Sequence, residues 1–320
     1  MSALERLGIV VNETERQECS DKQLQTRETF AFKWANRSSY ESEAMQEHAR
    51  RWELDRYCNG DPEILRGWLS EGEGRKIILD AGCGSGFSAL LFFNDLLKEH
   101  DYLGVDISEA VKVAKARFDE KGYPGDFVQY DIMNLPIPDE SVDLIFSEGV
   151  LHHTDSVHDA ILNLTRKLKN RGYFLFYVYR KKAVLRELAD DVVRQAIQDM
   201  NNEEAWKALL PLTMLGKSLG ELAVEIEVKD DIPVLGISKG RYDLQRFFYW
   251  NICKLFYRPD LTIEEMNHIN FDWYRPLNCH RHTPEEIALF CTEAGLITEH
   301  FKVEEAGITV VARKQGVNTT

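Results

Sequence analysis

The stretch at residues 79–89, "LDAGCGSGFSA", contains three glycines at alternating positions that follow an acidic residue in the sequence. Residues 76–82, "KIILDAG", are a short apolar run that ends in glycine, and such a run predicts a buried strand. Because glycine has no side chain, the backbone can turn tightly after this strand and approach a ligand closely. The stretch therefore predicts a binding loop between a strand and a helix. Its pattern is D-x-G-x-G-x-G, formed by Asp80, Gly82, Gly84 and Gly86.

Two common nucleotide-binding patterns do not match this loop. The dinucleotide fingerprint G-x-G-x-x-G needs a glycine at position 87, where the chain has Phe87. The loop that grips nucleoside triphosphates needs a Lys-Ser or Lys-Thr pair, which does not follow here. The loop allows a ligand to approach closely, but a pyrophosphate is not the ligand that fits it best.

Acidic residues at the ends of the next two predicted strands indicate a nucleoside. Asp106 ends the second strand, where a carboxylate can accept hydrogen bonds from both ribose hydroxyls. Asp131 ends the third strand and can meet a purine amino group, while Ile107 and Ile132 can sandwich the purine. A ligand with adenosine but no diphosphate fits these residues, and S-adenosylmethionine is such a ligand.

Predicted strands and helices alternate along the middle of the chain, which indicates an α/β, Rossmann-like, doubly wound parallel sheet. After a further helix at residues 283–296, two strands share a short turn around Gly307, and so short a link requires antiparallel pairing. We therefore expect the sheet to end in a hairpin with an antiparallel strand. The predicted strands are 76–82, 101–106, 126–131, 141–149, 173–179, 297–306 and 307–314, and the helices include 87–100, 109–122, capped by Ser108, and 156–172, closed by Gly172.

Composition and patterning divide the chain into three parts. Residues 1–70 are expected to form an N-terminal helical lid segment, and residues 71–180 with 283–320 the Rossmann-like core. Residues 181–282 read as mostly helical and are too long for a loop within a compact domain, so they predict an inserted helical cap. The aromatic run "FFYWNICKLFY" at residues 247–257 suits the core of this cap, a substrate wall or a dimer interface.

Four elements of the sequence together resemble a known enzyme class. They are "LDAGCGSG", "GVD", "YDIMNLPIPDESVDLIFSEGVLHH" and the terminal "AGL" with "ITVVARK", and they cover about residues 75–180 and 283–313. In this order and spacing they resemble a class I S-adenosylmethionine-dependent methyltransferase, of the small-molecule group that includes the ubiquinone- and menaquinone-biosynthesis methyltransferases. The resemblance implies seven strands, the seventh antiparallel. The cap and the N-terminal segment have no counterpart in it.

The resemblance also implies roles for the motif residues. The glycine loop with its aspartate would hold the methionine end of the cofactor, and Asp106 would bind the ribose. Asp131 with Ile132 would bind the adenine. Ser147 with Glu148 would line the floor beneath the sulfonium.

Methyl transfer from a sulfonium is an in-line displacement, because the positive sulfur already activates the methyl group. The protein must align the acceptor, exclude water and, where needed, remove a proton. His152 and His153 follow the fourth predicted strand, and one of them could be a general base. The alternative is that they orient the loop and cap the following helix.

Aromatic and polar residues outside the motifs are candidates for the acceptor site. The two aromatics Phe30 and Trp34 lie four residues apart and suit one face of a lid over the cofactor, or plain packing on the domain. The run "NCHRH" at residues 278–282 suits a polar loop over the substrate pocket better than a structural zinc site, because no second cluster stands at ligand spacing. We expect no metal. The candidate substrate residues are Phe30, Trp34, Arg37, Tyr40, Tyr274 and His280.

Charge and composition limit the partners. A net charge of −14 argues against binding to nucleic acid backbones and to anionic membranes. The apolar runs are too short to insert into a membrane, and six scattered cysteines indicate reduced thiols and a cytoplasmic protein. We expect S-adenosylmethionine-dependent methyl transfer to a small organic acceptor, with a possible homodimer through the cap.

Two other functions remain open at this point. One is a catalytically silent protein that binds S-adenosylmethionine or a partner methyltransferase, although the cofactor pattern is complete. The other is an enzyme that uses a modified S-adenosylmethionine. That enzyme would need an unusual basic residue near the methyl end, and the sequence pattern does not locate one.

Overall fold

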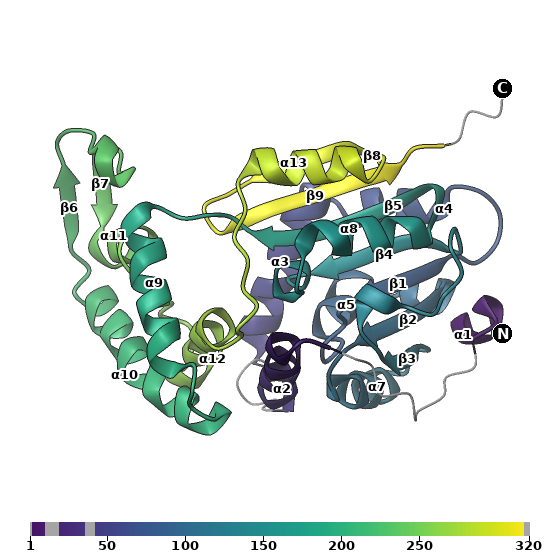
Figure 1. Cartoon of the computed structure of the whole chain (residues 1–320), viewed down its shortest axis with the longest axis horizontal. Coiled ribbons are helices and arrows are strands. Elements are labelled where there is room, and N and C mark those ends of the chain that lie inside the picture. The colour runs from purple at the N-terminus through teal and green to yellow at the C-terminus, as the bar shows by residue number, and fades with distance from the viewer. Residues whose placement is uncertain (1, 10–18, 36–41, 317–320) are drawn as a thin grey trace. The chain divides into compact units, whose positions relative to one another are not determined.

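A computed structural model describes residues 2–9, 19–35 and 42–316, which fall into two compact units. Unit 1 comprises Met1–Ala35, Glu47–Arg180 and His280–Thr320, and unit 2 comprises Asn36–Gln46 and Lys181–Cys279. Each unit has its own strands and helices (Figure 1). The three-part division expected from the sequence stays a prediction.

Unit 1 is built around a seven-stranded sheet with the strand order β3-β2-β1-β4-β5-β9-β8 (Figure 1). Strands β1 to β5 pair in parallel, whereas β9 lies between β5 and β8 and is antiparallel to both. The predicted α/β, Rossmann-like sheet with an antiparallel last strand is confirmed. The strands are β1 (Ile77–Ala81), β2 (Asp101–Asp106), β3 (Asp126–Gln129), β4 (Val142–Glu148), β5 (Leu168–Tyr179), β8 (Leu296–Val303) and β9 (Gly307–Lys314).

Helices pack on the two faces of this sheet. Successive residues of a strand point to opposite faces, and β4 illustrates this. Ile145 joins the core that the sheet forms with α1, α8 and α13. Phe146 instead contacts the rings of Tyr57, Phe92 and Phe93. The helices are α1 (Ala3–Leu7), α2 (Asp21–Ala35), α3 (Glu43–Cys58), α4 (Pro62–Ser70), α5 (Phe87–Phe92), α6 (Leu96–Glu99), α7 (Ala110–Lys121), α8 (Val157–Lys167) and α13 (Pro284–Glu293).

Two predicted helix boundaries are wrong. The helix expected at 87–100 is divided into α5 and α6, and Asn94 between them has a φ of 47°, in the left-handed region that interrupts a helix. Gly172 does not close α8, which ends at Lys167. It lies inside β5, where a Cβ would stand 2.8 Å from the carbonyl oxygen of Asp143. This glycine therefore permits a close approach of β5 to β4.

Unit 2 is mostly helical and also contains a two-stranded antiparallel hairpin that the sequence pattern does not predict. The aromatic run at 247–257 is only partly helical, because α11 ends at Asn251. Across the described residues, no helix combines the length and the apolar character needed to cross a membrane. The elements of unit 2 are α9 (Val184–Ile197), α10 (Asn202–Glu221), β6 (Glu225–Val228), β7 (Gly240–Asp243), α11 (Leu244–Asn251) and α12 (Ile263–Tyr274).

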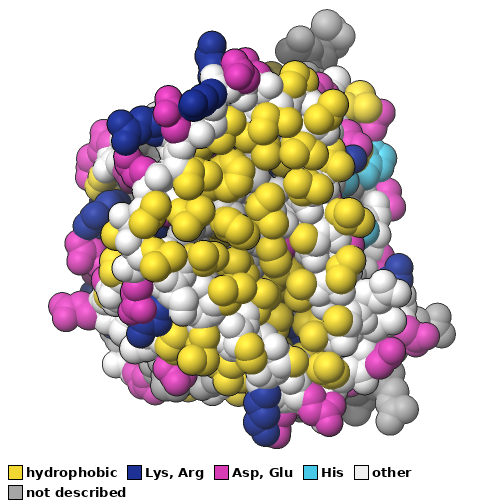
Figure 2. Space-filling view, turned by 90° about the vertical axis from the view of Figure 1, so that its left-hand side faces the viewer, with side chains coloured by type: hydrophobic (Ala, Val, Ile, Leu, Met, Phe, Trp, Pro, Cys, Tyr) yellow, Lys and Arg dark blue, Asp and Glu magenta, His cyan; other side chains and the backbone are white. Residues whose placement is uncertain are grey.

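Helix α9 has the reverse of the usual arrangement of polar and apolar side chains. Its Arg186 and Asp190 are buried, whereas Val184, Leu188 and Val192 are exposed at a spacing of four residues. Figure 2 shows a face of the molecule on which hydrophobic side chains gather. We call the exposed apolar residues of α9 and α10, with the residue after α10, the apolar face of unit 2. They are Val184, Leu188, Val192, Met214, Leu215 and Leu222.

Asp80 is the penultimate residue of β1 and is almost completely buried. Its carboxylate accepts a hydrogen bond from the hydroxyl of Tyr102 at 2.6 Å. Burial raises the pKa of Asp80 to about 7, and the negative charges of Asp106 and Glu148 act in the same direction. Since an aspartate in an unfolded chain has a pKa of about 3.9, the folded chain holds a proton here that the unfolded chain releases.

This difference predicts a pH-dependent loss of stability. Between pH 4 and pH 7 the unfolded chain binds fewer protons at this position, so the free energy of unfolding falls as pH rises through that window. Asp80→Asn removes the titration. The free energy of unfolding of the variant, minus that of the natural chain, should therefore increase by up to about 4 kcal/mol from pH 4 to pH 8.

Urea denaturation at several pH values measures this difference. Asp119→Asn is the matched control, because Asp119 is an exposed residue of α7 that pairs with Lys115. A difference between Asp80→Asn and the natural chain that stays constant with pH would contradict the assignment.

Candidate cofactor and acceptor site

The glycine loop after β1 has backbone conformations that residues with a side chain adopt only with strain. Gly82 and Gly84 have φ values of +93° and +51°. A Cβ on Gly82 would stand 2.3 Å from the side chain of Val150, and a Cβ on Gly84 would stand 2.8 Å from Nε1 of Trp34. Both positions thus require glycine for conformation and for space. The loop lies at the carboxyl edge of the sheet, where the backbone N–H groups of Gly82 and Cys83 both donate to the carbonyl oxygen of Val105 near the end of β2.

Asp106 ties this loop to the end of β2. Its Oδ2 accepts a hydrogen bond from the backbone N–H of Gly84 at 2.9 Å. Its Oδ1 accepts from the backbone N–H and the hydroxyl of Ser108, at 2.8 and 2.6 Å. Burial raises the pKa of Asp106, whereas these hydrogen bonds oppose that rise. A carboxylate has about four acceptor positions, so one remains for a ribose hydroxyl.

Helix α2 lies beside this loop and supplies aromatic side chains to it. The indole of Trp34 packs on Gly84, and the ring of Phe30 is 4.9 Å from the ring of His153. The ammonium of Lys33 stands 4.0 Å from the ring of Trp34 and lowers the pKa of Asp106 by its charge. Helix α2 therefore contacts the loop through Trp34. The candidates Arg37 and Tyr40 lie outside the described residues.

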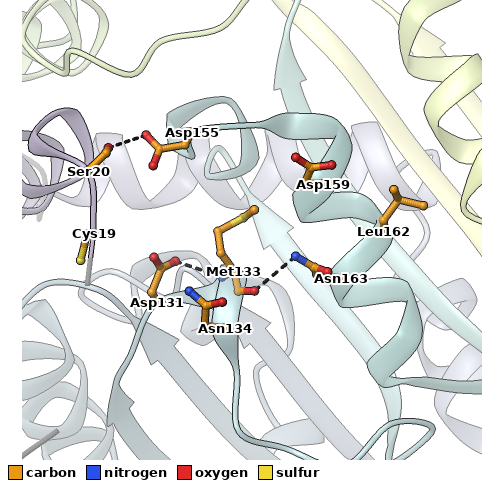
Figure 3. A pocket seen from close by; sticks show the side chains of 9 residues that line it. All are labelled: Cys19, Ser20, Asp131, Met133, Asn134, Asp155, Asp159, Leu162 and Asn163. Atoms are coloured by element: carbon orange, nitrogen blue, oxygen red, sulfur yellow. Dashed lines mark hydrogen bonds between the residues drawn. The ribbon is translucent and has the colours of Figure 1, made fainter. Parts of the chain in front are cut away.

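A cavity of 370 Å³ adjoins the residues expected to bind adenine (Figure 3). Asp131 lines it, and Oδ1 of Asp131 accepts a hydrogen bond from the backbone N–H of Met133 at 2.9 Å. Asp155 lines it from another side and accepts from the hydroxyl of Ser20 at 2.8 Å. The neighbouring Ile132 is buried in the sheet's core, whereas Ile107 is partly exposed. The lining residues are Cys19, Ser20, Asp131, Met133, Asn134, Asp155, Asp159, Leu162 and Asn163.

Ser147 and Glu148 end β4 next to β1. The hydroxyl of Ser147 donates to the carbonyl oxygen of Ala81 at 2.8 Å, which joins the two strand ends. The carboxylate of Glu148 pairs with Arg56 and accepts from the hydroxyl of Tyr57 at 2.6 Å. Glu148 is therefore held by α3 at the carboxyl edge of the sheet.

Helix α3 contributes residues that the sequence analysis missed. Arg56 is 0% exposed, and its Cζ lies 3.3 Å from the ring centroid of Trp52 and 3.9 Å from that of Tyr177. Among the described residues, Nε and Nη1 of Arg56 have no hydrogen-bond partner, and neither has Oε2 of the buried Glu53. Burial raises the pKa of Glu53 well above its usual range, and the charge of Glu148 adds to this rise. Residues 53, 56 and 57 share one helix face, and that spacing is the signal that could have identified them.

The histidines after β4 are buried. His152 stacks on Tyr179 with ring centroids 3.6 Å apart, and its ring centroid is 4.2 Å from that of His153. The backbone N–H of His280 donates to the carbonyl oxygen of His152 at 2.8 Å, so the chain at residue 280 runs beside these rings. The predicted candidates His152, His153 and His280 are thus brought together within unit 1.

The predicted candidate Tyr274 belongs to unit 2, where its hydroxyl donates to the carboxylate of Asp190 at 2.7 Å. This places Tyr274 in a buried polar network. Within residues 2–9, 19–35 and 42–316, no group of three or more His, Cys, Asp or Glu side chains is arranged to hold a metal ion.

Comparison with known proteins identifies the domain. Residues 79–176 match the family model described as "Methyltransferase domain". An uncharacterised methyltransferase, YcgJ of Bacillus subtilis, is 37% identical over 100 residues, which are 31% of this chain and 38% of the relative. The phthiotriol/phenolphthiotriol dimycocerosates methyltransferase of Mycobacterium tuberculosis is 29% identical over 141 residues, 42% of this chain and 51% of the relative. The chain thus spans about half or less of the length of these curated relatives.

Solved structures of methyltransferases also align with the chain. A SAM-dependent methyltransferase from Aquifex aeolicus aligns over 82% of this chain and 92% of its own length, at 15% identity and a TM-score of 0.42. The family model covers the glycine loop, Asp106, Asp131 and the end of β4. Residues 79–176 of the chain thus match a methyltransferase domain.

Proposed function

We propose that the chain transfers a methyl group from S-adenosylmethionine to a small organic acceptor. The observation that carries this proposal is the glycine loop of a methyltransferase domain tied to the buried Asp106. The bound cofactor would supply a methyl group that its sulfonium has already activated. The protein's own task would be to hold the cofactor, exclude water and position the acceptor for in-line attack.

The described residues suit the parts of the cofactor. The remaining acceptor position of Asp106 suits the ribose, and Asp131 at the rim of the cavity suits the adenine amino group. The unpartnered Nε and Nη1 of Arg56 suit the methionine carboxylate, and Oε2 of Glu53 suits its amino group. Leaving the guanidinium of Arg56 buried without these partners costs free energy, so a ligand carboxylate would stabilise it. A ligand ammonium would favour the charged form of Glu53 against the burial that raises its pKa. We propose these four residues, with Asp80, the glycine loop, Ser147 and Glu148, as the cofactor site.

A small acceptor is favoured over nucleic acid. The net charge is −14, and the cavity beside Asp131 is lined by two further aspartates, Asp155 and Asp159. Nucleic-acid binding relies on cations that neutralise phosphates, and these features oppose it. The membership of the ubiquinone-like group and the cytoplasmic location stay predictions.

The two buried histidines are better suited to positioning than to proton transfer. His152 is 0% exposed and His153 is 3% exposed, and both are packed among the aromatic rings of Tyr179 and Phe30. Proton transfer would require one imidazole to reach the acceptor within hydrogen-bond distance. We therefore favour the alternative in which His152 and His153 fix the loop after β4.

Cofactor affinity tests the proposed site. Asp106→Ala removes the carboxylate that anchors Gly84 and the ribose, so we expect the affinity for S-adenosylhomocysteine to fall by about 1.5–3 kcal/mol, or roughly 10- to 100-fold. Isothermal titration calorimetry gives both affinities. Asp119→Ala, on the exposed face of α7, is the control and should bind as the natural chain does. Equal affinities in Asp106→Ala and the control would remove Asp106 from the site, and a natural chain that binds no cofactor would overturn the proposed function.

The N-terminal lid is a second proposal about this site. Trp34 packs on Gly84, and Phe30 packs on His153, so α2 is positioned to exclude water from a bound cofactor. Product release then requires the segment to open, which suits a weakly held helix. We propose that the described residues 26–35 of this segment become ordered over the cofactor and contribute to the acceptor pocket.

Hydrogen exchange with and without S-adenosylhomocysteine tests the lid. Protection of residues 26–35 should increase when the ligand binds, while protection of β1 and β4 should stay nearly constant. Equal protection of α2 in both states would identify Trp34 and Phe30 as ordinary core residues. An absence of protection in both states would identify the segment as a tail.

We also propose that the chain forms a homodimer through the apolar face of unit 2. Six large apolar side chains there are between 50% and 65% exposed, which is unfavourable in water. A two-fold interface needs only one self-complementary surface, and an uncharged apolar stripe such as that of α9 meets this requirement. The face lies on a chain of net charge −14, which disfavours an anionic lipid surface as the occupant.

Light scattering after size-exclusion chromatography tests the dimer. The natural chain should have twice the mass of a 37.0 kDa protomer, and the double variant Leu188→Glu/Val192→Glu should have the mass of one. Leu289→Glu changes an equally exposed leucine on α13 of unit 1 and should leave the dimer intact. A natural chain that stays monomeric at micromolar concentration would overturn the proposal.

A further inference from the structure

Helix α7 packs closely against the glycine loop. A Cβ on Gly86 would stand 3.0 Å from Cε2 of Phe118 and 3.3 Å from the Cβ of Ala114, and Gly86 has a φ of +70°. The helix can approach the backbone this closely only because residue 86 is a glycine. Cys83, earlier in the loop, joins Val111 and Ala114 of the same helix in a small apolar cluster. One face of α7 is thus in direct contact with the loop.

A charged residue belongs to this face of α7. Arg117 is 5% exposed, and its Nη1 donates a hydrogen bond to Oγ of Ser85 at 3.2 Å. Ser85 stands between Gly84 and Gly86 and is 1% exposed. The Cζ of Arg117 also lies 5.2 Å from the ring centroid of Phe87, which is within the range of a cation–π contact. Arg117 therefore contacts the two residues on either side of Gly86.

The place of Ser85 in the loop gives this hydrogen bond its effect. The neighbouring Gly84 and Gly86 have φ values of +51° and +70°. Glycine has more accessible backbone conformations than any other residue, so a Gly-x-Gly segment loses much conformational entropy when it becomes ordered. Within this segment only Ser85 has a side chain that another element can hold. The hydrogen bond from Arg117 therefore limits the motion of both glycines.

Gly84 has contacts of a different kind. Its backbone N–H donates to Asp106, and the indole of Trp34 in α2 packs on it. Helix α2 is the proposed lid, which has to move when the product leaves. Helix α7 packs instead on β2 and β3, so its contacts with the loop do not depend on the position of α2. The hydrogen bond from Arg117 can therefore hold the loop while the lid is open.

We propose that Arg117 is a positioning residue of the cofactor loop, which acts through Ser85 to keep residues 84–87 in the observed conformation before the cofactor binds. A preformed loop loses less conformational entropy on binding than a loop that orders around its ligand, so it binds the ligand more tightly. The positioning is a property of the ligand-free chain. Its effect on the binding of S-adenosylmethionine rests on the proposed function.

Hydrogen exchange of the ligand-free chain tests the positioning. The N–H of Gly86 donates to the carbonyl oxygen of Cys83 at 2.8 Å within the loop, so its exchange reports on the loop conformation. In Arg117→Met and in Ser85→Ala, exchange at Gly86 should become roughly tenfold faster, whereas exchange in β1 should stay unchanged. Ser85→Ala deletes a single hydroxyl, so it decides the question if Arg117→Met fails to fold.

The matched control lies on the exposed side of the same helix. Lys115→Met removes a cation of α7 that pairs with Asp119, and exchange at Gly86 should remain as in the natural chain. The proposal is wrong if Gly86 exchanges at the same rate in the natural chain and in both site variants.

A double-mutant cycle measured by calorimetry tests the effect on the cofactor. Arg117→Met and Ser85→Ala should each weaken the binding of S-adenosylhomocysteine by roughly tenfold, as expected for the loss of one hydrogen bond to a charged group. Because both changes remove the same contact, the double variant should bind no more weakly than Arg117→Met alone. Additive losses would show that the two residues act independently and would also overturn the proposal. If the natural chain binds no S-adenosylhomocysteine, the proposed function fails, and hydrogen exchange still tests the positioning.

Discussion

The carboxylate of Asp106 is the group on which the cofactor edge of unit 1 depends. It accepts hydrogen bonds from Gly84 in the loop after β1 and from Ser108 after β2, so it connects two successive strand–helix turns. A buried backbone N–H without an acceptor would cost about 1–3 kcal/mol, and this pairing avoids that cost at the buried Gly84. The same bond fixes Gly84 in its left-handed conformation, which gives Trp34 the bare backbone on which it packs.

Side chains of helix α3 contact the end of β4 at the same edge of the sheet. Its Arg56 pairs with Glu148 at the end of β4 and lies between the rings of Trp52 and Tyr177. Burying an ion pair costs more free energy than its attraction returns unless the remaining donors are also satisfied, and within the part of the chain that the structure describes two donors of Arg56 are not. Tyr57 lies on the same helix face and donates a hydrogen bond to Glu148. Glu53, also on this face, adds an acceptor near Glu148.

Local patterns in the sequence were sufficient for much of this architecture. The alternation of strands and helices, the short turn before β9 and the spacing of the glycines are properties of neighbouring residues, and all three predict the observed sheet. The sequence pattern wrongly predicts a helix end at Gly172, because a glycine after a helical pattern is typical of a helix end. The role of Gly172 depends instead on Asp143 in another strand. Glu53 and Arg56 escaped prediction for a similar reason. Charged residues three apart on a helix are typical of a solvated face, and only the sheet packed against them reveals that they are buried.

In unit 2, local sequence patterns do not predict which side chains of α9 are buried. The spacing of Val184, Leu188 and Val192 is typical of a buried apolar stripe, but these side chains are exposed. The spacing of Arg186 and Asp190 is typical of an exposed ion pair, but both residues are buried. The inversion follows from Asp190, because its four donors come from α9, the backbone at residue 254 and α12, and they can meet only if the polar side of α9 faces inward. A polar interior of this kind contributes less hydrophobic stabilisation than an apolar one, but the four donors that meet at Asp190 fix α9 and α12 relative to one another. The packing of these two helices is thus specified by the positions of polar groups.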